Sequence, residues 1–362
     1  MKQLVCLSHT PWRSTPNRTQ QLLTRLKDVN ILYFEPPVSS GQKGRRDGGH
    51  KVRPNIVTYT LPPRLDERVE SRLLHRSSLS RQSRFVSKIM QKHRFRDPAL
   101  WLTSPEYHLL PEAIPHRGLI YDCAREWDDL PLDWESELAL HADVIFAASP
   151  GLIRRLSPCC DNIALIPNGV NYTMFSQERA SHSPPRVLAR HKGPVLGRVG
   201  SITSTLELEP LLFAAAAQPD WTFLLIGSAE EEIKKLLSHF PNIILTGQIP
   251  MVDVPDHLNS CNGCFDLLSR RTKGCDILPT RIYEYLAVGK PLILMIEPEQ
   301  VEPYPDVIYT ATDPSSFLRR CRSALEEDPT WVCERRRAYA QHAQWNLRAE
   351  EIQHILEATA LF

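Results

Sequence analysis

The chain has 362 residues, of which 42% are hydrophobic and 23% are charged, and its formal net charge at pH 7 is +1. Domains usually span about 100–200 residues, so this length predicts two of them. The composition is typical of a globular enzyme and excludes a low-complexity chain, and we expect no nucleic-acid partner.

The first residues of the chain predict a buried strand. The apolar run at 3–8 is shorter than the apolar region of a signal peptide and is soon followed by polar residues. No run elsewhere approaches the ~18 apolar residues that a membrane-spanning helix needs. The nine cysteines are an odd number, and without an export signal we expect them to be reduced thiols. These features predict a cytoplasmic protein.

The first half of the chain alternates short β-branched runs with helical patterns, which predicts βαβ units and a mostly parallel sheet. We expect its strands at residues 3–8, 30–34, 55–59, 99–103, 118–122, 143–148 and 162–166. We expect helices between them at residues 17–26, 70–91 and 132–142.

Polar and aromatic side chains follow the first predicted strand. His9 and Trp12 lie in the loop after it, and Arg18 opens the next helix. In a doubly wound sheet, ligands bind beyond the carboxyl ends of the strands. We therefore take Trp12 and Arg18 as candidate contacts to an acceptor or a phosphate, and His9 also as a candidate catalytic group. Trp12 could equally cover the edge of the domain.

Residues 64–96 are strongly basic, with ten Lys and Arg against three acids. Apolar residues of the same segment could form a membrane-facing side next to the cations; they are Leu73, Leu74, Leu79, Phe85, Ile89 and Met90. We therefore predict that Arg64–Arg96 attaches the protein to an anionic membrane surface, as a peripheral protein at the inner face of the cell membrane. The alternative is a solvated helix or a disordered lid.

Carboxylates stand at the end of the strand predicted at 118–122. Asp122 is its last residue and Glu126 lies one turn further on, so either could act as a base or hold an acceptor hydroxyl. Asp122 could alternatively cap the following helix. We interpret the adjacent Asp128 and Asp129 as solvated surface and not as a metal site.

Residues 177–193 lack a regular pattern and predict a hinge linker. After it we expect strands at 194–199, 221–226, 242–245, 265–268, 291–296 and 307–309, and two closing helices at 330–342 and 347–360. The sequence thus predicts two doubly wound α/β domains, with a ligand site in the cleft between them. Cys261 and Cys264 have C-x-x-C spacing, but no second pair with matching spacing follows, so we interpret them as buried thiols and not as a zinc site.

The segment 273–293 carries the most specific signal. A loop with cations at 270, 271 and 273 leads into a helix that begins near Pro279, which the first turn of a helix tolerates. Free N–H groups at Thr280, with Arg281 in the same turn, would form an anion site suited to a diphosphate. Glu284, one turn on, could accept hydrogen bonds from two adjacent hydroxyls such as those of a ribose. Gly289 ends the helix.

The sequence from Pro279 to Pro291, P-T-R-I-Y-E-Y-L-A-V-G-K-P, resembles the donor-binding motif P-x-K-x-x-E-Y-L-A-x-G-K-P of GT-B glycosyltransferases. It is most similar to glycosyltransferase family 4 and its relatives in bacterial cell-surface polysaccharide assembly, including the teichuronic-acid type. Arg281 replaces the lysine of the motif. The two acids of the family, E-x7-E, correspond to Asp276 and Glu284, and the shorter Asp276 could contact the transferred sugar or serve as a helix N-terminal acid.

The resemblance extends along most of the chain. Similar motifs occur at residues 8–22, 118–127, 142–149, 161–175, 197–201, 242–250 and 345–349. By resemblance, Arg198 and Gly200 belong to the turn that opens the donor domain, and Gln248 and Ile249 to the loop that packs on the nucleotide base. Many family members carry a lysine about five residues after the arginine, where this chain has Thr203.

The resemblance implies a GT-B fold, with two Rossmann-like domains at 1–176 and 194–345 facing an inter-domain cleft. The linker 177–193 would join them, and the last helix, 346–362, would cross back to the first domain. The implied donor-binding residues are Arg198, Gly200, Gln248, Ile249, Asp276, Thr280, Arg281 and Glu284.

The implied reaction moves a sugar from a nucleotide sugar, such as a UDP- or GDP-sugar, to a polysaccharide or lipid-linked glycan precursor. Retention of anomeric configuration is favoured, and neither a metal nor a further cofactor is expected. Two alternatives remain open at the level of sequence. One is a non-hydrolysing nucleotide-sugar 2-epimerase, which shares the fold, and the other is a catalytically inactive nucleotide-binding protein.

Overall fold

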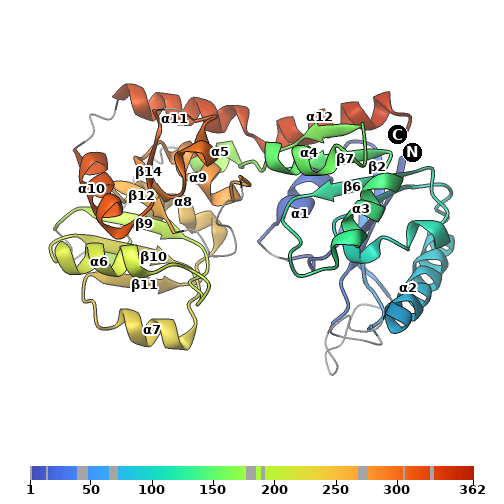
Figure 1. The fold of residues 1–362 in the computed structure, drawn as a ribbon, viewed down its shortest axis with the longest axis horizontal. Helices are drawn as coiled ribbons and strands as arrows, with labels where there is room; N and C mark the ends of the chain where they lie inside the picture. The colour runs from blue at the N-terminus through green and yellow to red at the C-terminus, as the bar shows by residue number, and fades with distance from the viewer. Residues whose placement is uncertain are drawn as a thin grey trace. The chain divides into compact units, whose positions relative to one another are not determined.

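The computed structural model describes residues 2–13, 15–38, 48–64, 72–176, 185–188, 192–267, 276–304, 306–326 and 330–362. The chain divides into two compact units (Figure 1). The N-terminal unit comprises Met1–Pro167 and Trp345–Phe362, and the C-terminal unit comprises Asn168–Gln344. Most of the linker expected at 177–193 lies outside the described residues. The expectation of an α/β protein with two doubly wound sheets is confirmed.

The N-terminal unit is built on an eight-stranded sheet with the order β3-β4-β2-β1-β5-β6-β7-β8. Its strands are β1 Lys2–Leu7, β2 Val29–Glu35, β3 His50–Arg53, β4 Ile56–Thr60, β5 Ala99–Leu102, β6 Gly118–Cys123, β7 Val144–Ala147 and β8 Ile163–Leu165. All neighbours pair in parallel except β3, which pairs antiparallel with β4. The sequence did not predict β3 because this short edge strand is mostly exposed and carries no apolar run.

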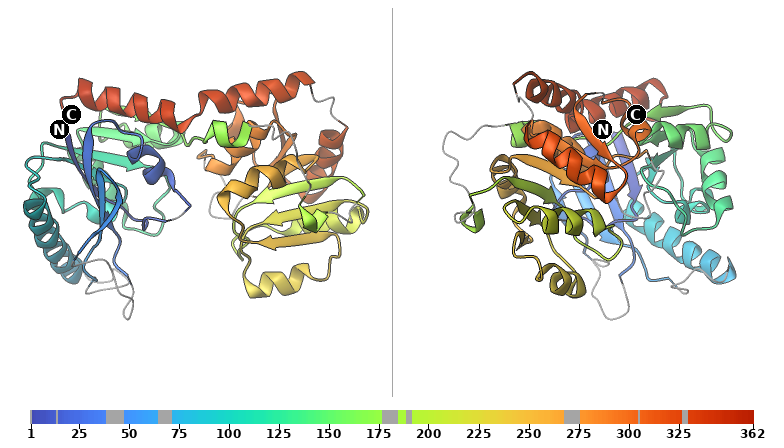
Figure 2. Two further views of the ribbon diagram at one scale, coloured as in Figure 1. Left: turned by 180° about the vertical axis from the view of Figure 1, so that it is seen from behind. Right: turned by 60° about the vertical axis from the view of Figure 1, so that its left-hand side comes forward.

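Helices cover both faces of this sheet (Figure 2). They are α1 Arg18–Leu23, α2 Arg72–Lys92, α3 Leu132–His141, α4 Pro150–Leu156 and α12 Trp345–Ala358, with the short 3-10 helices η1 Pro105–Tyr107 and η2 Pro111–Ala113. The last helix, α12, belongs to the N-terminal unit and packs with α1 in one core cluster. On the other face, Phe85 of α2 contacts the rings of Phe34 and Tyr59.

The prediction of an apolar, membrane-facing side on α2 is wrong, because the apolar residues of this helix mostly belong to the core. Leu79, Ile89 and Met90 are each only 4% exposed, and Phe85 is half-buried. Leu73 and Leu74 alone of the proposed set are exposed. The apolar side chains expected to face a membrane therefore pack α2 against the sheet of its own unit. No helix in the described ranges combines the length and apolar character needed to cross a membrane.

The C-terminal unit has a six-stranded sheet with the order β11-β10-β9-β12-β13-β14. Its strands are β9 Val195–Val199, β10 Thr222–Ile226, β11 Ile243–Gly247, β12 Gly263–Asp266, β13 Leu292–Met295 and β14 Ile308–Ala311, all parallel. The strand order reverses between β9 and β12. Ligands of doubly wound folds bind at such a switch point, beyond the carboxyl ends of the strands.

The helices of this unit divide between the two faces of the sheet. They are α5 Tyr172–Ser176, α6 Glu209–Ala217, α7 Glu231–Leu237, α8 Val254–Asn259, α9 Thr280–Val288, α10 Pro314–Leu325 and α11 Thr330–His342, with 3-10 helices η3 Arg186–Leu188, η4 Met251–Asp253 and η6 Pro298–Val301. One core cluster contains residues of α8, α9 and α11, and the other contains residues of α6, α7 and α10. Gly289 ends α9 at a φ of 78°, as the sequence predicts.

Candidate functional site

The strand switch of the C-terminal unit brings together two residues from neighbouring strands. Arg198, on β9, is only 2% exposed, and its Nε donates to Oδ1 of the fully buried Asp266 over 2.9 Å. Nη1 of Arg198 also donates to the carbonyl oxygen of Gly200 over 3.2 Å. Gly200 has a φ of 122°, a left-handed conformation that glycine adopts at little cost. The turn after β9 thus wraps the arginine head group.

Asp266 also holds the second candidate cation. Nε of Arg281, in the first turn of α9, contacts the other carboxylate oxygen, Oδ2. The side chain of Arg281 is 27% exposed, compared with 2% for Arg198. Arg281 is therefore the cation that a ligand can reach. The buried Arg198 binds the same carboxylate and so helps to hold Asp266 in position for Arg281. Sequence reasoning missed Asp266, although an acid within the apolar strand predicted at 265–268 was a visible signal.

Glu284 is a buried carboxylate, 6% exposed, one turn after Arg281. Burial raises its pKa from 4.5 to about 7, and the positive charge of Arg281 offsets part of this rise. Among the residues that the structure describes, none forms a hydrogen bond with its carboxylate. A buried carboxylate without hydrogen-bond donors is costly, so this group is well placed to accept hydrogen bonds from a ligand.

The start of α9 presents backbone N–H groups next to Glu284 and Arg281. Its N-cap is Pro279, which makes no side-chain capping hydrogen bond. Within the helix, the hydroxyl of Tyr285 accepts a hydrogen bond from the Val199 N–H over 2.7 Å. This bond ties α9 to the end of β9. The helix start is therefore fixed beside the strand switch, where it can bind an anion.

The remaining donor-side candidates take different positions. Asp276 and Thr280 are half-buried just before and at the start of α9. Gln248 is exposed, and Ile249 is half-buried against the core of the unit. The cations at 270, 271 and 273 lie outside the described residues. Thr203, which stands where relatives carry a lysine, contacts the hydroxyl of Thr205 over 2.8 Å.

In the N-terminal unit, the corresponding strand switch lies between β1 and β5. The main-chain N–H of His9 donates to Oγ1 of Thr103 over 2.9 Å, and the ring Nδ1 lies 2.8 Å from the same oxygen. The ring packs edge-on against Trp127. Burial lowers the pKa of His9 from 6.5 to about 4, and the positive charge of Arg125 adds to this lowering. His9 is therefore a neutral imidazole near pH 7.

Asp122 is the penultimate residue of β6 and is 1% exposed. Its Oδ1 accepts a hydrogen bond from Nε of Arg18 over 3.0 Å, and Nη2 of the same guanidinium lies 2.9 Å from that oxygen in an ion pair. The structure thus joins two predicted site residues in one buried ion pair. The helix-cap alternative for Asp122 is wrong, because the next helix begins at Leu132 and its N-cap is Pro131.

Glu126 and Trp12 are engaged in other contacts. Glu126 forms an ion pair with Arg155, which also binds Glu135 over 3.0 Å. The main-chain N–H of Trp12 donates to Oε1 of Glu35 over 2.9 Å, and its ring packs edge-on against Tyr33. Trp12 therefore covers the core at this edge of the unit.

No described residues form a group of three or more His, Cys, Asp or Glu able to hold a metal ion. Asp128 and Asp129 are both exposed, and Asp129 pairs with Arg125 over 2.7 Å. Cys261 and Cys264 are free and buried, and burial raises the pKa of Cys261 to about 12. The buried-thiol interpretation is confirmed.

Comparison with known proteins gives one curated relative. A protein of Bacillus subtilis (strain 168), assigned to teichuronic acid biosynthesis as a glycosyltransferase, is 27% identical over 283 residues, which cover 70% of each chain. No protein-family model matches the chain.

Solved structures match almost the whole chain. Sucrose-phosphate synthase from Thermosynechococcus elongatus superposes with a TM-score of 0.74 at 16% identity, covering 99% of both chains. HepE of Anabaena, in complex with UDP and glucose, gives a TM-score of 0.69 at 13% identity over 98% of this chain and 99% of its own. The trehalose-phosphate synthase of Burkholderia xenovorans, in complex with glucose-6-phosphate, gives a TM-score of 0.72 at 12% identity. The match covers 98% of this chain and 100% of the synthase chain. At these identities, the similarity establishes the fold.

Proposed function

We propose that this chain, a glycosyltransferase of the GT-B fold, transfers a sugar from a nucleoside-diphosphate donor to a polysaccharide or lipid-linked glycan precursor. The observation that carries the proposal is the buried carboxylate of Glu284 beside the half-buried guanidinium of Arg281. A ribose would satisfy the carboxylate with two hydroxyls, and the diphosphate would lie against Arg281 and the start of α9. The UDP bound to HepE supports a UDP-sugar as the first donor to test.

The reaction breaks the bond between the anomeric carbon of the sugar and the terminal phosphate oxygen. An acceptor hydroxyl forms the new bond to that carbon and releases its proton. Arg281 and the N–H groups of α9 would stabilise the negative charge that develops on the leaving diphosphate. Arg198 contributes through Asp266, which holds both guanidinium groups in place. Retention at the anomeric carbon is expected from the resemblance to family 4.

The acceptor side of the reaction would use the N-terminal unit. Asp122 lies at the carboxyl end of β6, where doubly wound sheets place ligand contacts. Its ion pair with Arg18 fixes the carboxylate, so we propose that it orients the acceptor hydroxyl or takes its proton. His9 is a second candidate for this role, because a neutral imidazole ring can donate a hydrogen bond to a hydroxyl or accept one from it.

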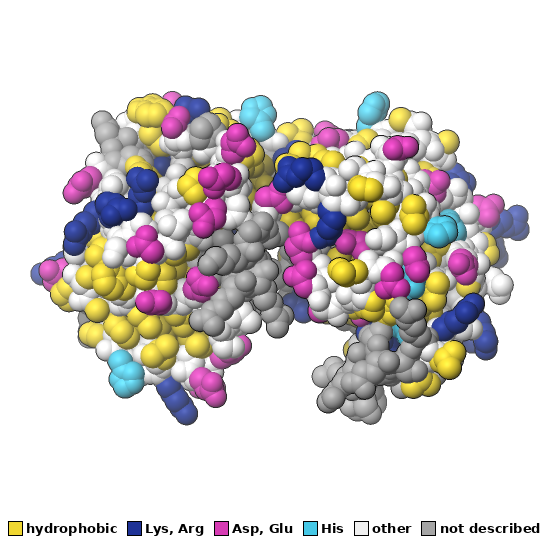
Figure 3. Space-filling view, in the orientation of Figure 1, with side chains coloured by type: hydrophobic (Ala, Val, Ile, Leu, Met, Phe, Trp, Pro, Cys, Tyr) yellow, Lys and Arg dark blue, Asp and Glu magenta, His cyan; other side chains and the backbone are white. Residues whose placement is uncertain are grey.

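A membrane-bound acceptor would explain the basic helix α2. Its 21 residues include no acid, and its exposed cations include Arg76, Arg81, Arg84 and Lys88. Lys and Arg side chains gather over this helix in the space-filling view (Figure 3). Such a surface suits the anionic head groups of a membrane that carries a lipid-linked glycan.

The deciding experiment measures transfer from a panel of sugar nucleotides, chosen by thermal shift. A nucleotide that binds the folded chain raises its melting temperature by mass action. We expect a UDP- or GDP-sugar to stabilise the protein and to be consumed with release of the nucleoside diphosphate. Conversion of the donor to its 2-epimer without transfer would assign the epimerase activity instead. Stabilisation with no turnover on any acceptor would favour a nucleotide-binding protein.

A further inference from the structure

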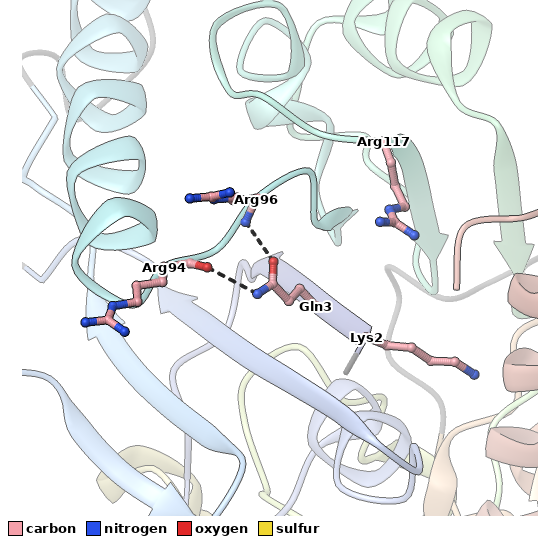
Figure 4. Close-up of a pocket in the computed structure, with 5 residues that line it drawn as sticks. All are labelled: Lys2, Gln3, Arg94, Arg96 and Arg117. Carbon is pink, nitrogen blue, oxygen red and sulfur yellow. Dashed lines mark hydrogen bonds between the residues drawn. The ribbon is translucent and has the colours of Figure 1, made fainter.

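The N-terminal unit has a polar pocket at the edge of its sheet where the strands begin (Figure 4). The pocket has a volume of about 440 Å³ and is lined by Lys2, Gln3, Arg94, Arg96 and Arg117. These residues start or precede β1, β5 and β6, which are neighbours in the sheet and run parallel. The proposed acceptor residues follow the carboxyl ends of strands at the opposite edge. The pocket is therefore separate from the site already described.

The cations around this pocket have few acidic partners. Lys2 pairs with Glu357, but Arg94, Arg96 and Arg117 form no ion pair with any carboxylate in the described part of the chain. Nε of Arg117 donates to a main-chain oxygen, that of Asp97, over 2.8 Å. All three guanidinium groups are exposed. Their uncompensated charge makes the pocket attractive to an anion.

The turn that carries Arg94 and Arg96 is held in place by Gln3. Its Oε1 accepts a hydrogen bond from the Arg96 N–H over 2.7 Å, and its Nε2 donates to the Arg94 carbonyl oxygen over 3.3 Å (Figure 4). A strand residue thus fixes the loop after α2. The two arginines are presented by a fixed backbone and not by a free surface loop.

The backbone at Arg94 favours glycine. Arg94 has a φ of 58°, and its N–H donates to the carbonyl oxygen of Gln91 over 3.1 Å. The next N–H, of Phe95, donates to Met90 over 2.8 Å, so the end of α2 is a Schellman motif with Arg94 at its left-handed position. Glycine is the usual residue there because a side chain strains this conformation. The local fold therefore does not account for an arginine, whereas binding an anion would.

We propose that this pocket binds a ligand that carries more than one phosphate group. Guanidinium groups match the geometry of phosphate oxygens and bind them through paired hydrogen bonds. In Figure 4, Arg94 and Arg96 lie on one side of Gln3, and Arg117 and Lys2 lie on the other. The cations therefore surround the pocket and do not converge on one point. The phosphates could belong to a soluble molecule or to the head groups of a lipid surface, which share this chemistry.

The first arm of the test uses inorganic tripolyphosphate as the soluble probe. Calorimetry compares the unaltered chain with an Arg94→Gln/Arg96→Gln variant, which should bind roughly tenfold more weakly because two exposed ion pairs are lost. The matched control is Arg319→Gln/Arg322→Gln, which removes two exposed arginines from α10 in the other unit. We expect the pocket substitutions to leave unchanged any binding of tripolyphosphate by the C-terminal unit.

The second arm uses vesicles of phosphatidylcholine with and without phosphatidylglycerol. If the ligand is a lipid head group, the pocket variant should lose flotation with the anionic vesicles while the control retains it. Melting temperatures of both variants establish that they are folded. A loss of tripolyphosphate binding or of vesicle flotation in the pocket variant, but not in the control, supports the proposed phosphate site. The arm that shows the loss identifies whether the ligand is soluble or a lipid head group. The proposal is overturned if the pocket variant matches the control in both arms. This outcome would leave the proposed sugar transfer intact, since neither arm measures turnover.

Discussion

At the scale of single residues, we expect Glu284 to make the affinity for a nucleotide depend on pH. Its pKa of about 7 in the free protein means that the carboxylate form, which accepts hydroxyl hydrogen bonds, is gained as pH rises through 7. We therefore expect the dissociation constant for UDP, measured by calorimetry, to fall between pH 6 and pH 8. Glu284→Gln should weaken binding at pH 8 by about 1.5–3 kcal/mol and flatten the profile.

The same variant should affect the ligand-free protein in the opposite direction. A carboxyl whose pKa is raised on folding stabilises the fold at low pH, and this contribution is lost as pH rises through about 7. Glu284→Gln should therefore raise the melting temperature at pH 8 and change it little at pH 5. Glu334→Gln, an exposed site on α11, is the control. In the UDP calorimetry, titration of the diphosphate itself is the same for the unaltered chain, the Glu284 variant and the Glu334 control. Identical pH profiles in the unaltered chain and the Glu284 variant would contradict this role.

At the scale of secondary-structure elements, the ion pair of Arg18 and Asp122 joins α1 to β6. This ion pair gives a second prediction. Asp122→Asn should lower turnover by about 10²–10⁴ and leave UDP affinity nearly unchanged, because Asp122 belongs to the other unit. It should also destabilise the fold by about 3–5 kcal/mol, since the buried guanidinium of Arg18 loses its ion pair with Asp122. Turnover assays and thermal melts measure the two effects separately.

A double variant separates chemistry from stability at this pair. Arg18→Gln/Asp122→Asn removes both charges, so it should regain much of the lost stability. Turnover should stay low if Asp122 acts on the acceptor. Turnover that returns together with the melting temperature would show that the pair only stabilises the fold.

The sequence predicted the elements of the fold better than the contacts of the site. Strands such as 118–122 were visible because buried parallel strands are short apolar runs between helices. Glu284 and Arg281 were visible because both lie in one continuous motif. The ion pairs of Asp266 with Arg198 and of Asp122 with Arg18 could not be predicted, because each joins residues that are far apart in the chain. Which side of an amphipathic helix such as α2 meets its own core is likewise decided by the sheet beneath it.

The exposed side of α2 yields a third prediction. Arg76→Gln/Arg81→Gln/Arg84→Gln removes three exposed cations and should reduce flotation with anionic vesicles at low salt, because each basic residue near such a surface contributes about 1 kcal/mol. Leu73→Ser, which replaces a side chain that is 80% exposed, tests whether an apolar contact adds to this binding. Equal flotation of the unaltered chain and the triple variant would exclude α2 as the attachment surface.

At the scale of the whole molecule, our proposal is that the protein, and not a metal ion, balances the negative charge that develops in the reaction. This proposal gives the last prediction. The leaving diphosphate gains negative charge as its bond to the sugar breaks. Arg281, held by Asp266 together with Arg198, and the N–H groups that begin α9 are positioned at the strand switch to compensate that charge.

We therefore expect turnover to persist in EDTA and to fall by at least tenfold in Arg281→Gln, because this substitution removes the cation that a ligand can reach. The two measurements are complementary, because a metal-dependent enzyme would show the opposite order of sensitivity. Arg335→Gln, which replaces a half-buried cation on α11, controls for the general loss of positive charge in this unit. Activity abolished by EDTA and restored by Mg²⁺ or Mn²⁺ would place the compensating charge on a metal ion.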